Sequence, residues 1–150
     1  MRGLCLILIL SQFATAPLAF AALGERESQI ATDQVRLRAN KVQRTTQSRF
    51  SVHEITSDSN TVKEFVGADG VVFAVSWRGT FRPDFESLFG SYYEDYHARD
   101  ASRPRMISRH PVSITTDQIV VQKGGHMRDV HGIAYIPSKL PPGVQPEDLQ

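Results

Sequence analysis

The residues in this chain best suited to proton transfer are two glutamates, Glu54 and Glu64. Glu64 alternates with Val62 and Val66, so its carboxylate shares a face with apolar side chains, where a lone charge is costly. If the strand that carries Glu54 pairs in the right register, the two carboxylates lie close together and one of them holds a proton, as in acid/base enzymes. We favour a plainer interpretation, an edge position or a pairing with arginine, because structural ion pairs produce similar groups of charges.

Metal-binding and nucleophilic chemistry have little support in the sequence. His126 and His131 lie on opposite arms of a predicted hairpin and could meet a metal ion together with His110, but no carboxylate partner is assured. His53 and Glu54 lack the histidine four residues later that a metalloprotease helix carries. The chain has no Gly-x-Ser-x-Gly or Ser-x-x-Lys motif. We therefore predict no metal site, no cofactor and no catalytic residue.

Basic side chains gather in two stretches of the sequence. The later stretch has four arginines with only Asp100 between them: Arg99, Arg103, Arg105 and Arg109. The earlier one has five basic residues and no acid: Arg36, Arg38, Lys41, Arg44 and Arg49. If the two stretches meet in space, they form an anion-attracting patch for envelope lipid head groups or other polyanions. A solvated face is the simpler interpretation.

The first residues have the pattern of a secretory signal peptide. Arg2 precedes an apolar run from Leu4 to Leu10, and small residues lead to the cleavage pattern Ala19-Phe20-Ala21. The run is too short to span a membrane. We predict a signal peptide at residues 1–21 and an exported mature protein, periplasmic or secreted, without a transmembrane segment.

The composition of the predicted mature chain narrows the classes of function. Removing Arg2 from 17 basic residues leaves 16, which equal the 16 acidic ones, so a globally basic nucleic-acid-binding protein is disfavoured. The single cysteine, Cys5, lies within the signal peptide, so packing and not a disulfide must hold the fold together.

Hydrophobic periodicity predicts an α+β domain over residues 22–137, followed by a proline-rich tail at 138–150. We expect a helix at 23–42, a strand near 49–55, a hairpin at 61–77 with its turn between Gly67 and Gly70, a helix after Pro83, and a second hairpin around Gly124-Gly125. The order is α-β-β-β-α-β-β, with an antiparallel sheet of about five strands and two helices.

The core of this domain is predicted from two sets of apolar residues. The hairpin places Val62, Phe73, Val75 and Trp77 on one face, and Phe85, Leu88, Phe89 and Tyr92 recur at helical spacing opposite them. Tyr93 lies off this helical stripe, which makes it a candidate contact for a partner.

Several motifs together resemble a known family. They are "LGERESQ", "VHEI", "VKEFVGADGVVFAVSWRG", "PDFESLFGSYYEDY" and "GGHMRDVHGIAYIPSKLPPGV". In this order the sequence resembles the exported bacterial proteins grouped as domain of unknown function 2844, over nearly the whole mature chain. The resemblance implies an exported single domain and supplies no catalytic residue. Thr80 and Phe81 stand where the family pattern has a proline, which affects the shape of one loop.

These observations leave three functional hypotheses. The first is a non-catalytic binding or accessory domain of the cell envelope that acts through a protein partner. The second is a module that binds polyanions or the envelope surface through Arg99, Arg103, Arg105 and Arg109. The least favoured is an acid/base enzyme that uses Glu54 and Glu64.

Overall fold

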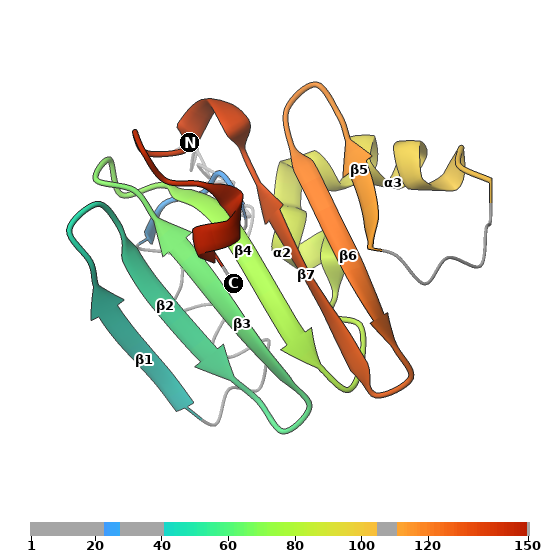
Figure 1. Ribbon diagram of the computed structural model, residues 1–150, viewed down its shortest axis with the longest axis horizontal. Helices are drawn as coiled ribbons and strands as arrows, with labels where there is room; N and C mark the ends of the chain where they lie inside the picture. The colour runs from blue at the N-terminus through green and yellow to red at the C-terminus, as the bar shows by residue number, and fades with distance from the viewer. Residues whose placement is uncertain (1–22, 28–40, 105–110, 150) are drawn as a thin grey trace, which may run out of the picture.

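The computed structural model describes residues 23–27, 41–104 and 111–149 of the chain. Within these ranges, seven strands form one antiparallel sheet: β1 (Lys41–Thr46), β2 (Ser51–Thr56), β3 (Asn60–Val66), β4 (Val72–Gly79), β5 (Val112–Thr115), β6 (Val120–His126) and β7 (Asp129–Tyr135). Their order across the sheet is β1-β2-β3-β4-β7-β6-β5. A helical segment follows β4 and consists of α2 (Phe85–Phe89), the 3-10 turn η2 (Gly90–Tyr92) and α3 (Tyr93–Ala101). It lies against one side of the sheet (Figure 1).

The prediction of five strands and two helices is therefore wrong, because the described residues form seven strands in one sheet and a single α-helical segment, between β4 and β5. The two unpredicted strands are β1 and β5, which form the edges of the sheet. All six residues of β1 are exposed, so its sequence has no alternation between buried and exposed positions. β5 has only four residues and follows an arginine-rich connection broken by two prolines, so the sequence gives little sign of a strand there.

The helix predicted at residues 23–42 is wrong at both of its described ends. Leu23–Glu27 form a turn, in which Arg26 makes an isolated bridge with Val71. At the other end, Lys41 and Val42 begin β1 and pair with β2. The middle of the prediction, residues 28–40, lies outside the described residues.

The β3–β4 hairpin supplies one surface of the main core. Val62 pairs with Trp77 and Glu64 with Val75, so these side chains share the side of the sheet that the helical segment covers, which we call the helix face. Phe85, Leu88 and Phe89 of α2 are buried there, and the ring of Phe85 lies 5.1 Å from that of Trp77. Tyr92 is half-buried against this core.

A β-bulge moves Phe73 to the opposite side of the sheet, which we call the open face. Phe65 pairs with Ala74 and Val66 with Val72, so Phe73 is the extra residue between them. Its ring therefore packs against Phe50 and Phe65 and not against the helix. The sequence prediction placed Phe73 on the face of Trp77, because alternation alone does not reveal a bulge.

The helical segment begins and changes direction at residues with clear local roles. The carboxylate of Asp84 accepts hydrogen bonds from the backbone N–H groups of Glu86 and Ser87 and caps α2. Gly90 has a φ of 50°, a conformation that glycine adopts without the steric cost of a side chain. The continuous helix expected after Pro83 is thus interrupted at Gly90 and resumes as α3.

The second hairpin turns at Met127-Arg128 and not at Gly124-Gly125 as predicted. His126 pairs with Asp129, which leaves a two-residue loop, and Arg128 has a φ of 68°. Gly125 lies within β6, where a Cβ atom would overlap the carbonyl oxygen of Asp129. Gly125 therefore permits the close approach of β6 and β7, and it does not form the turn.

The C-terminal segment covers one end of the open face (Figure 1). It contains two 3-10 turns, η3 (Pro137–Lys139) and η4 (Pro146–Leu149). Val144 and Leu149 are buried in a second core with Phe50, Phe65, Phe73, Ala74 and Ile133. Arg49 Nη1 donates a 2.7 Å hydrogen bond to the carbonyl of Gly143 and ties the segment to the β1–β2 turn. No helix of the described residues is long and apolar enough to cross a membrane.

Candidate functional site

Two of the hollows formed by the described residues bring several polar side chains together. The first, the sheet-face groove, has a volume of about 600 Å³ and lies on the part of the open face that the C-terminal segment leaves uncovered. The second, the helix–sheet cleft, has a volume of about 680 Å³ and lies between α2, α3 and β6. Both volumes are in the range of small-ligand sites.

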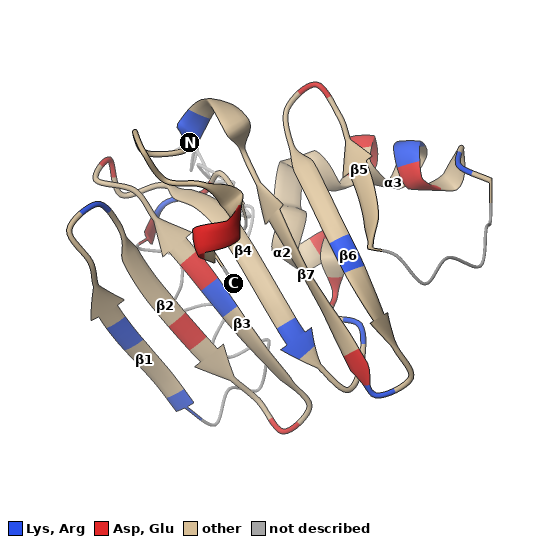
Figure 2. Ribbon diagram, viewed as in Figure 1, with Lys and Arg blue, Asp and Glu red and all other residues tan. Residues whose placement is uncertain are grey.

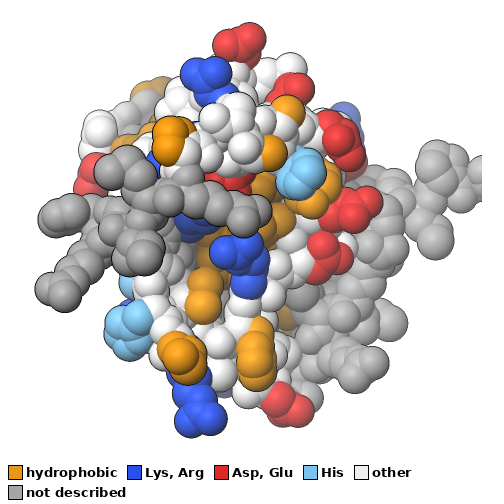
Figure 3. Space-filling model, turned by 90° about the vertical axis from the view of Figure 1, so that its right-hand side faces the viewer, with side chains coloured by type: hydrophobic (Ala, Val, Ile, Leu, Met, Phe, Trp, Pro, Cys, Tyr) orange, Lys and Arg blue, Asp and Glu red, His pale blue; other side chains and the backbone are white. Residues whose placement is uncertain are grey.

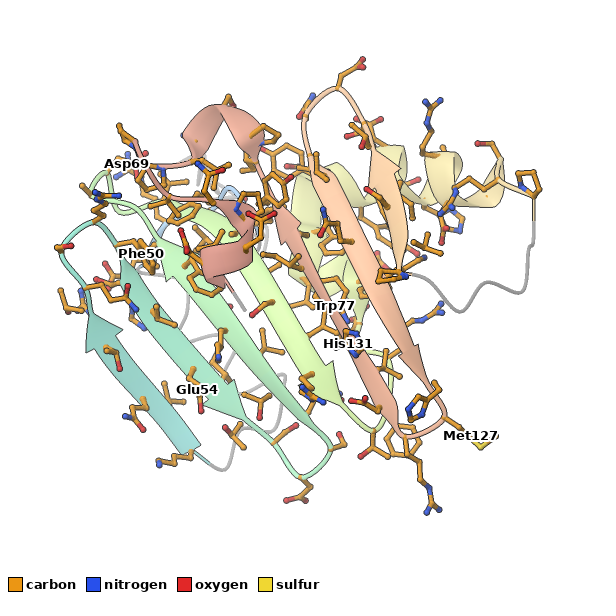
Figure 4. The ribbon with its side chains drawn as sticks, in the orientation of Figure 1. Phe50, Glu54, Asp69, Trp77, Met127 and His131 are labelled. Carbon is orange, nitrogen blue, oxygen red and sulfur yellow. The ribbon has the colours of Figure 1, made fainter. Side chains whose placement is uncertain are left out.

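Five neighbouring strands build the sheet-face groove. One cross-strand row consists of Glu54, Lys63, Ser76, Ile133 and Gln122, which the strand pairing of β2, β3, β4, β7 and β6 places side by side. The row therefore presents one acidic, one basic, two uncharged polar and one apolar side chain. Glu54 and His131 mark this region in Figure 4.

The next row of the groove ends in a charged cluster. Arg78 pairs with His131 across β4 and β7, and Arg78 Nη2 lies 3.2 Å from Asp129 Oδ1. His131 Nδ1 lies 3.9 Å from the same carboxylate oxygen. The imidazole extends over Gly124, where an added Cβ atom would lie 3.1 Å from Nε2. A side chain at Gly124 would fill the space that this end of the groove provides.

The two glutamates proposed for acid/base chemistry lie on opposite faces of the sheet. Glu64 pairs with His53 and is fully buried on the helix face, whereas Glu54 pairs with Lys63 and lines the sheet-face groove on the open face. The paired-carboxylate arrangement is therefore not formed. Next to Glu64, His53 Nε2 lies 3.0 Å from Glu27 Oε1, which also lies 2.9 Å from Arg44 Nη2.

The histidines considered for a metal site are only partly within the described residues. His126 and His131 lie on adjacent strands, with His126 opposite Asp129 and His131 opposite Gly124. His110 lies outside the described ranges. Among the residues that the structure describes, no group of three or more His, Cys, Asp or Glu side chains is arranged to hold a metal ion.

A hydrogen-bonded triad forms the base of the helix–sheet cleft. Lys123 Nζ of β6 donates to Tyr96 Oη at 2.7 Å and to Asp100 Oδ2 at 2.5 Å, both on α3. Its side chain is only 16% exposed, and Nζ lies 5.1 Å from the centre of the Tyr96 ring. This contact joins α3 to the sheet with a charge-assisted hydrogen bond, which is stronger than a neutral one.

The cleft perturbs the protonation of two of these groups. Burial and the carboxylate of Asp100 raise the pKa of Tyr96 well above its ordinary value. Burial alone would raise the pKa of Asp100, but the hydrogen bond and the positive charge of Lys123 outweigh it and hold the pKa below its ordinary value. Perturbed titration inside a hollow is typical of functional sites.

Substituting Asp100→Asn is expected to destabilise the protein most at neutral pH. A carboxylate with a lowered pKa stabilises the fold above its unfolded-state pKa, and this contribution is lost as the pH falls through the lower, folded-state value. The difference in unfolding free energy between wild type and variant should therefore shrink below about pH 4. Urea denaturation from pH 3 to pH 7 measures it. The same substitution in a Lys123→Met background should show much weaker pH dependence; an undiminished one would contradict the assignment to Lys123.

The arginines predicted to bind anions are separated by the fold. Arg103 lines the helix–sheet cleft, whereas Arg99 lines a shallower depression with Asp95 and Asp117. Arg105 and Arg109 lie outside the described residues. The described members of the earlier basic stretch are on β1 and its turn, at the opposite edge of the sheet from α3 (Figure 2). The described arginines of the two stretches thus do not meet.

Tyr93, the predicted partner contact, also lines the helix–sheet cleft. Its ring is half-buried and stacks on His97, with 5.5 Å between the ring centres. Two further cations of the cleft, Arg82 and Lys123, were not expected from the sequence. For Lys123 a signal existed, because it alternates with Val121 and so falls on the helix face among buried residues.

Comparison with known proteins agrees with the resemblance seen in the sequence motifs. A family model described as "Protein of unknown function (DUF2844)" matches residues 19–149. Comparison with curated proteins and comparison with solved structures find no match. The family match covers most of the chain, including every described strand and the helical segment. The chain therefore belongs to the DUF2844 family of proteins of unknown function.

Proposed function

We propose that this protein is a non-catalytic binding domain of the bacterial cell envelope, which holds a segment of a protein partner in the sheet-face groove. The observation that carries the proposal is the groove itself, a hollow of about 600 Å³ on the open face of the sheet. Its base is formed by regular strands, so the groove is preorganised and a partner need not order it on binding.

The side chains of the groove suit a polypeptide better than a polyanion. Glu54 and Lys63 lie side by side, and Arg78 is already paired with Asp129. This mixture of signs complements the mixed charges of a protein segment, whereas a polyanion would be repelled by Glu54. Ile133 and Pro111 add apolar surface between the charges.

The chain itself provides an example of a polypeptide on this face. The C-terminal segment lies across the adjoining part of the sheet and buries Val144 and Leu149 against it. Tyr135 of β7 shows the closeness of the contact, because burial and the charge of Glu147 raise its pKa. We infer that a partner segment extends this coverage onto the neighbouring groove.

The export that the sequence predicts supports a role in the envelope. The predicted signal peptide at residues 1–21 directs the mature domain to the periplasm or the outside of the cell. The acid/base alternative has no support, because Glu54 and Glu64 lie on opposite faces. The polyanion alternative requires a patch of arginines that the described residues do not form.

Reversing the charges of the groove should abolish partner binding. The mature protein, the groove variant Lys63→Glu/Arg78→Glu and the control variant Lys139→Glu/Arg99→Glu are each used to capture proteins from envelope extracts, with quantification by mass spectrometry. The control has the same change in net charge at residues outside the groove. We expect a partner that wild type and control retain equally, and that the groove variant retains at least about tenfold less.

Thermal melting establishes that each variant is folded before the capture experiment. A partner retained equally by the folded groove variant would place the interface elsewhere on the protein. Absence of any retained protein, together with specific turnover in a screen of substrates, would overturn the proposal of a non-catalytic domain.

A further inference from the structure

We propose that the helix–sheet cleft is a second, separate binding site, whose ligand is an acidic saccharide with one carboxylate on each sugar unit. The inference goes beyond the protein partner of the sheet-face groove and rests on different residues. The cleft lies on the helix face and is lined by charged, hydroxyl-bearing and aromatic side chains of α2, α3, β6 and the residues just before α2 and just after α3.

Two guanidinium groups line the cleft and can supply hydrogen-bond donors to a ligand. Arg82 lies over the ring of Phe85 at 5.7 Å from its centre, and Arg103 Nη1 is 4.0 Å from Asp100 Oδ1. Among the described residues, neither guanidinium makes a hydrogen bond within 3.5 Å. A guanidinium binds a carboxylate through two parallel N–H donors. Figure 3 views the molecule from the edge of the sheet where β5 and α3 lie. Near the centre of this view, Lys and Arg side chains lie beside hydrophobic ones.

The acids of the cleft determine which anion is suited to it. Asp84 is occupied in capping α2, and Asp100 accepts hydrogen bonds from Lys123 and Tyr96. Glu86 remains at the rim and would repel a dense polyanion such as a polyphosphate. A ligand with isolated carboxylates can approach the arginines and still leave Glu86 as an acceptor for its hydroxyl groups.

The remaining lining suits a sugar ring with hydroxyl groups. The stacked rings of Tyr93 and His97 form one wall of the cleft and offer a flat surface for the apolar face of a sugar. The carboxylate of Asp100, whose side chain is 32% exposed at the base of the cleft, can accept a hydrogen bond from a ligand hydroxyl in addition to those from Lys123 and Tyr96. A hollow of about 680 Å³ admits more than one sugar unit.

Calorimetric titration of the mature protein with trigalacturonate tests the proposal. Maltotriose, a neutral trisaccharide, and inorganic phosphate serve as parallel probes. We expect trigalacturonate to bind, and neither maltotriose nor phosphate to bind measurably at the same concentrations. Arg82→Gln and Arg103→Gln should each weaken binding by about tenfold or more, as expected for loss of a charge-assisted hydrogen bond. Tyr93→Ala should weaken it as well.

Arg99→Gln is the matched control, because Arg99 is an exposed arginine of α3 outside the cleft. It should leave the affinity for trigalacturonate unchanged. The proposal is overturned if trigalacturonate does not bind, if maltotriose or phosphate binds equally well, or if Arg99→Gln weakens binding as much as the cleft variants. The groove variant Lys63→Glu/Arg78→Glu should bind the trisaccharide normally, so this test and that of the protein partner can fail independently.

Discussion

Replacing Trp77 with Ala is expected to lower the free energy of unfolding by about 3–5 kcal/mol. The indole is 3% exposed and packs against Phe85 at 5.1 Å and Phe89 at 6.0 Å between ring centres. It joins the sheet to α2, so its removal leaves a cavity that the strands cannot fill by collapsing. Urea denaturation of the mature protein measures the loss. The unfolding is monitored by the circular dichroism of the backbone, because the variant lacks the tryptophan whose fluorescence would otherwise be used.

The exposed aromatic Phe81 provides the control for Trp77. Its side chain is 66% exposed in the loop after β4, so Phe81→Ala should change the unfolding free energy by less than about 0.5 kcal/mol. A loss below about 1 kcal/mol for Trp77→Ala would mean that the indole does not hold the helical segment on the sheet.

Replacing Gly132 with Val is expected to lower the free energy of unfolding by about 3 kcal/mol. Here the loss comes from atoms added to a filled space, and not from a cavity. Gly132 pairs with Trp77 across β4 and β7, and the indole occupies the space above it. A Cβ atom at this position would overlap the indole and lie 2.5 Å from the carbonyl oxygen of Gln122. Overpacking of this kind forces side chains from their rotamers and shifts the backbone. The same denaturation experiment applies.

The cost at Gly132 should depend on the indole. In a Trp77→Leu background, Gly132→Val should cost less than in the wild type, since part of the overlap is gone and the two changes are coupled. Gly67→Ala is the matched control, because the nearest atom to its added Cβ belongs to the flexible carboxylate of Asp69. Equal costs for Gly132→Val in both backgrounds would show that the steric conflict is with the backbone alone.

Sequence alternation predicted those strands that have one buried face. In β3, Val62 and Val66 lie two residues on either side of Glu64, and in β4 Val75 and Trp77 lie two residues apart; all of these residues are buried. The facing of Glu64 followed from this pattern. The edge strand β1 has no buried residue, so no period existed to be recognised. The bulge at Phe73 and the turn at Arg128 depend on how neighbouring strands pair, which is information that a single segment does not contain.

The candidate sites were predictable to a lesser degree. Tyr93 and Arg103 were singled out separately, and the fold brings both to the helix–sheet cleft. Lys123 and Arg82 join them because β6 packs beneath α3, a long-range contact that spacing along the chain does not reveal. The sheet-face groove was not foreseen, since it depends on the order of five strands.

The pairing of β4 with β7 has a consequence for the rate of folding. Ala74 pairs with Tyr135, although the helical segment and two other strands separate them along the chain. Closing such a long loop costs chain entropy before its contacts form, and distant pairings of this kind slow folding. The β3–β4 and β6–β7 hairpins are local and can form early. We therefore expect the docking of these two hairpins, through the pairing of β4 with β7, to limit the rate of folding. The floor of the sheet-face groove is completed in that late step.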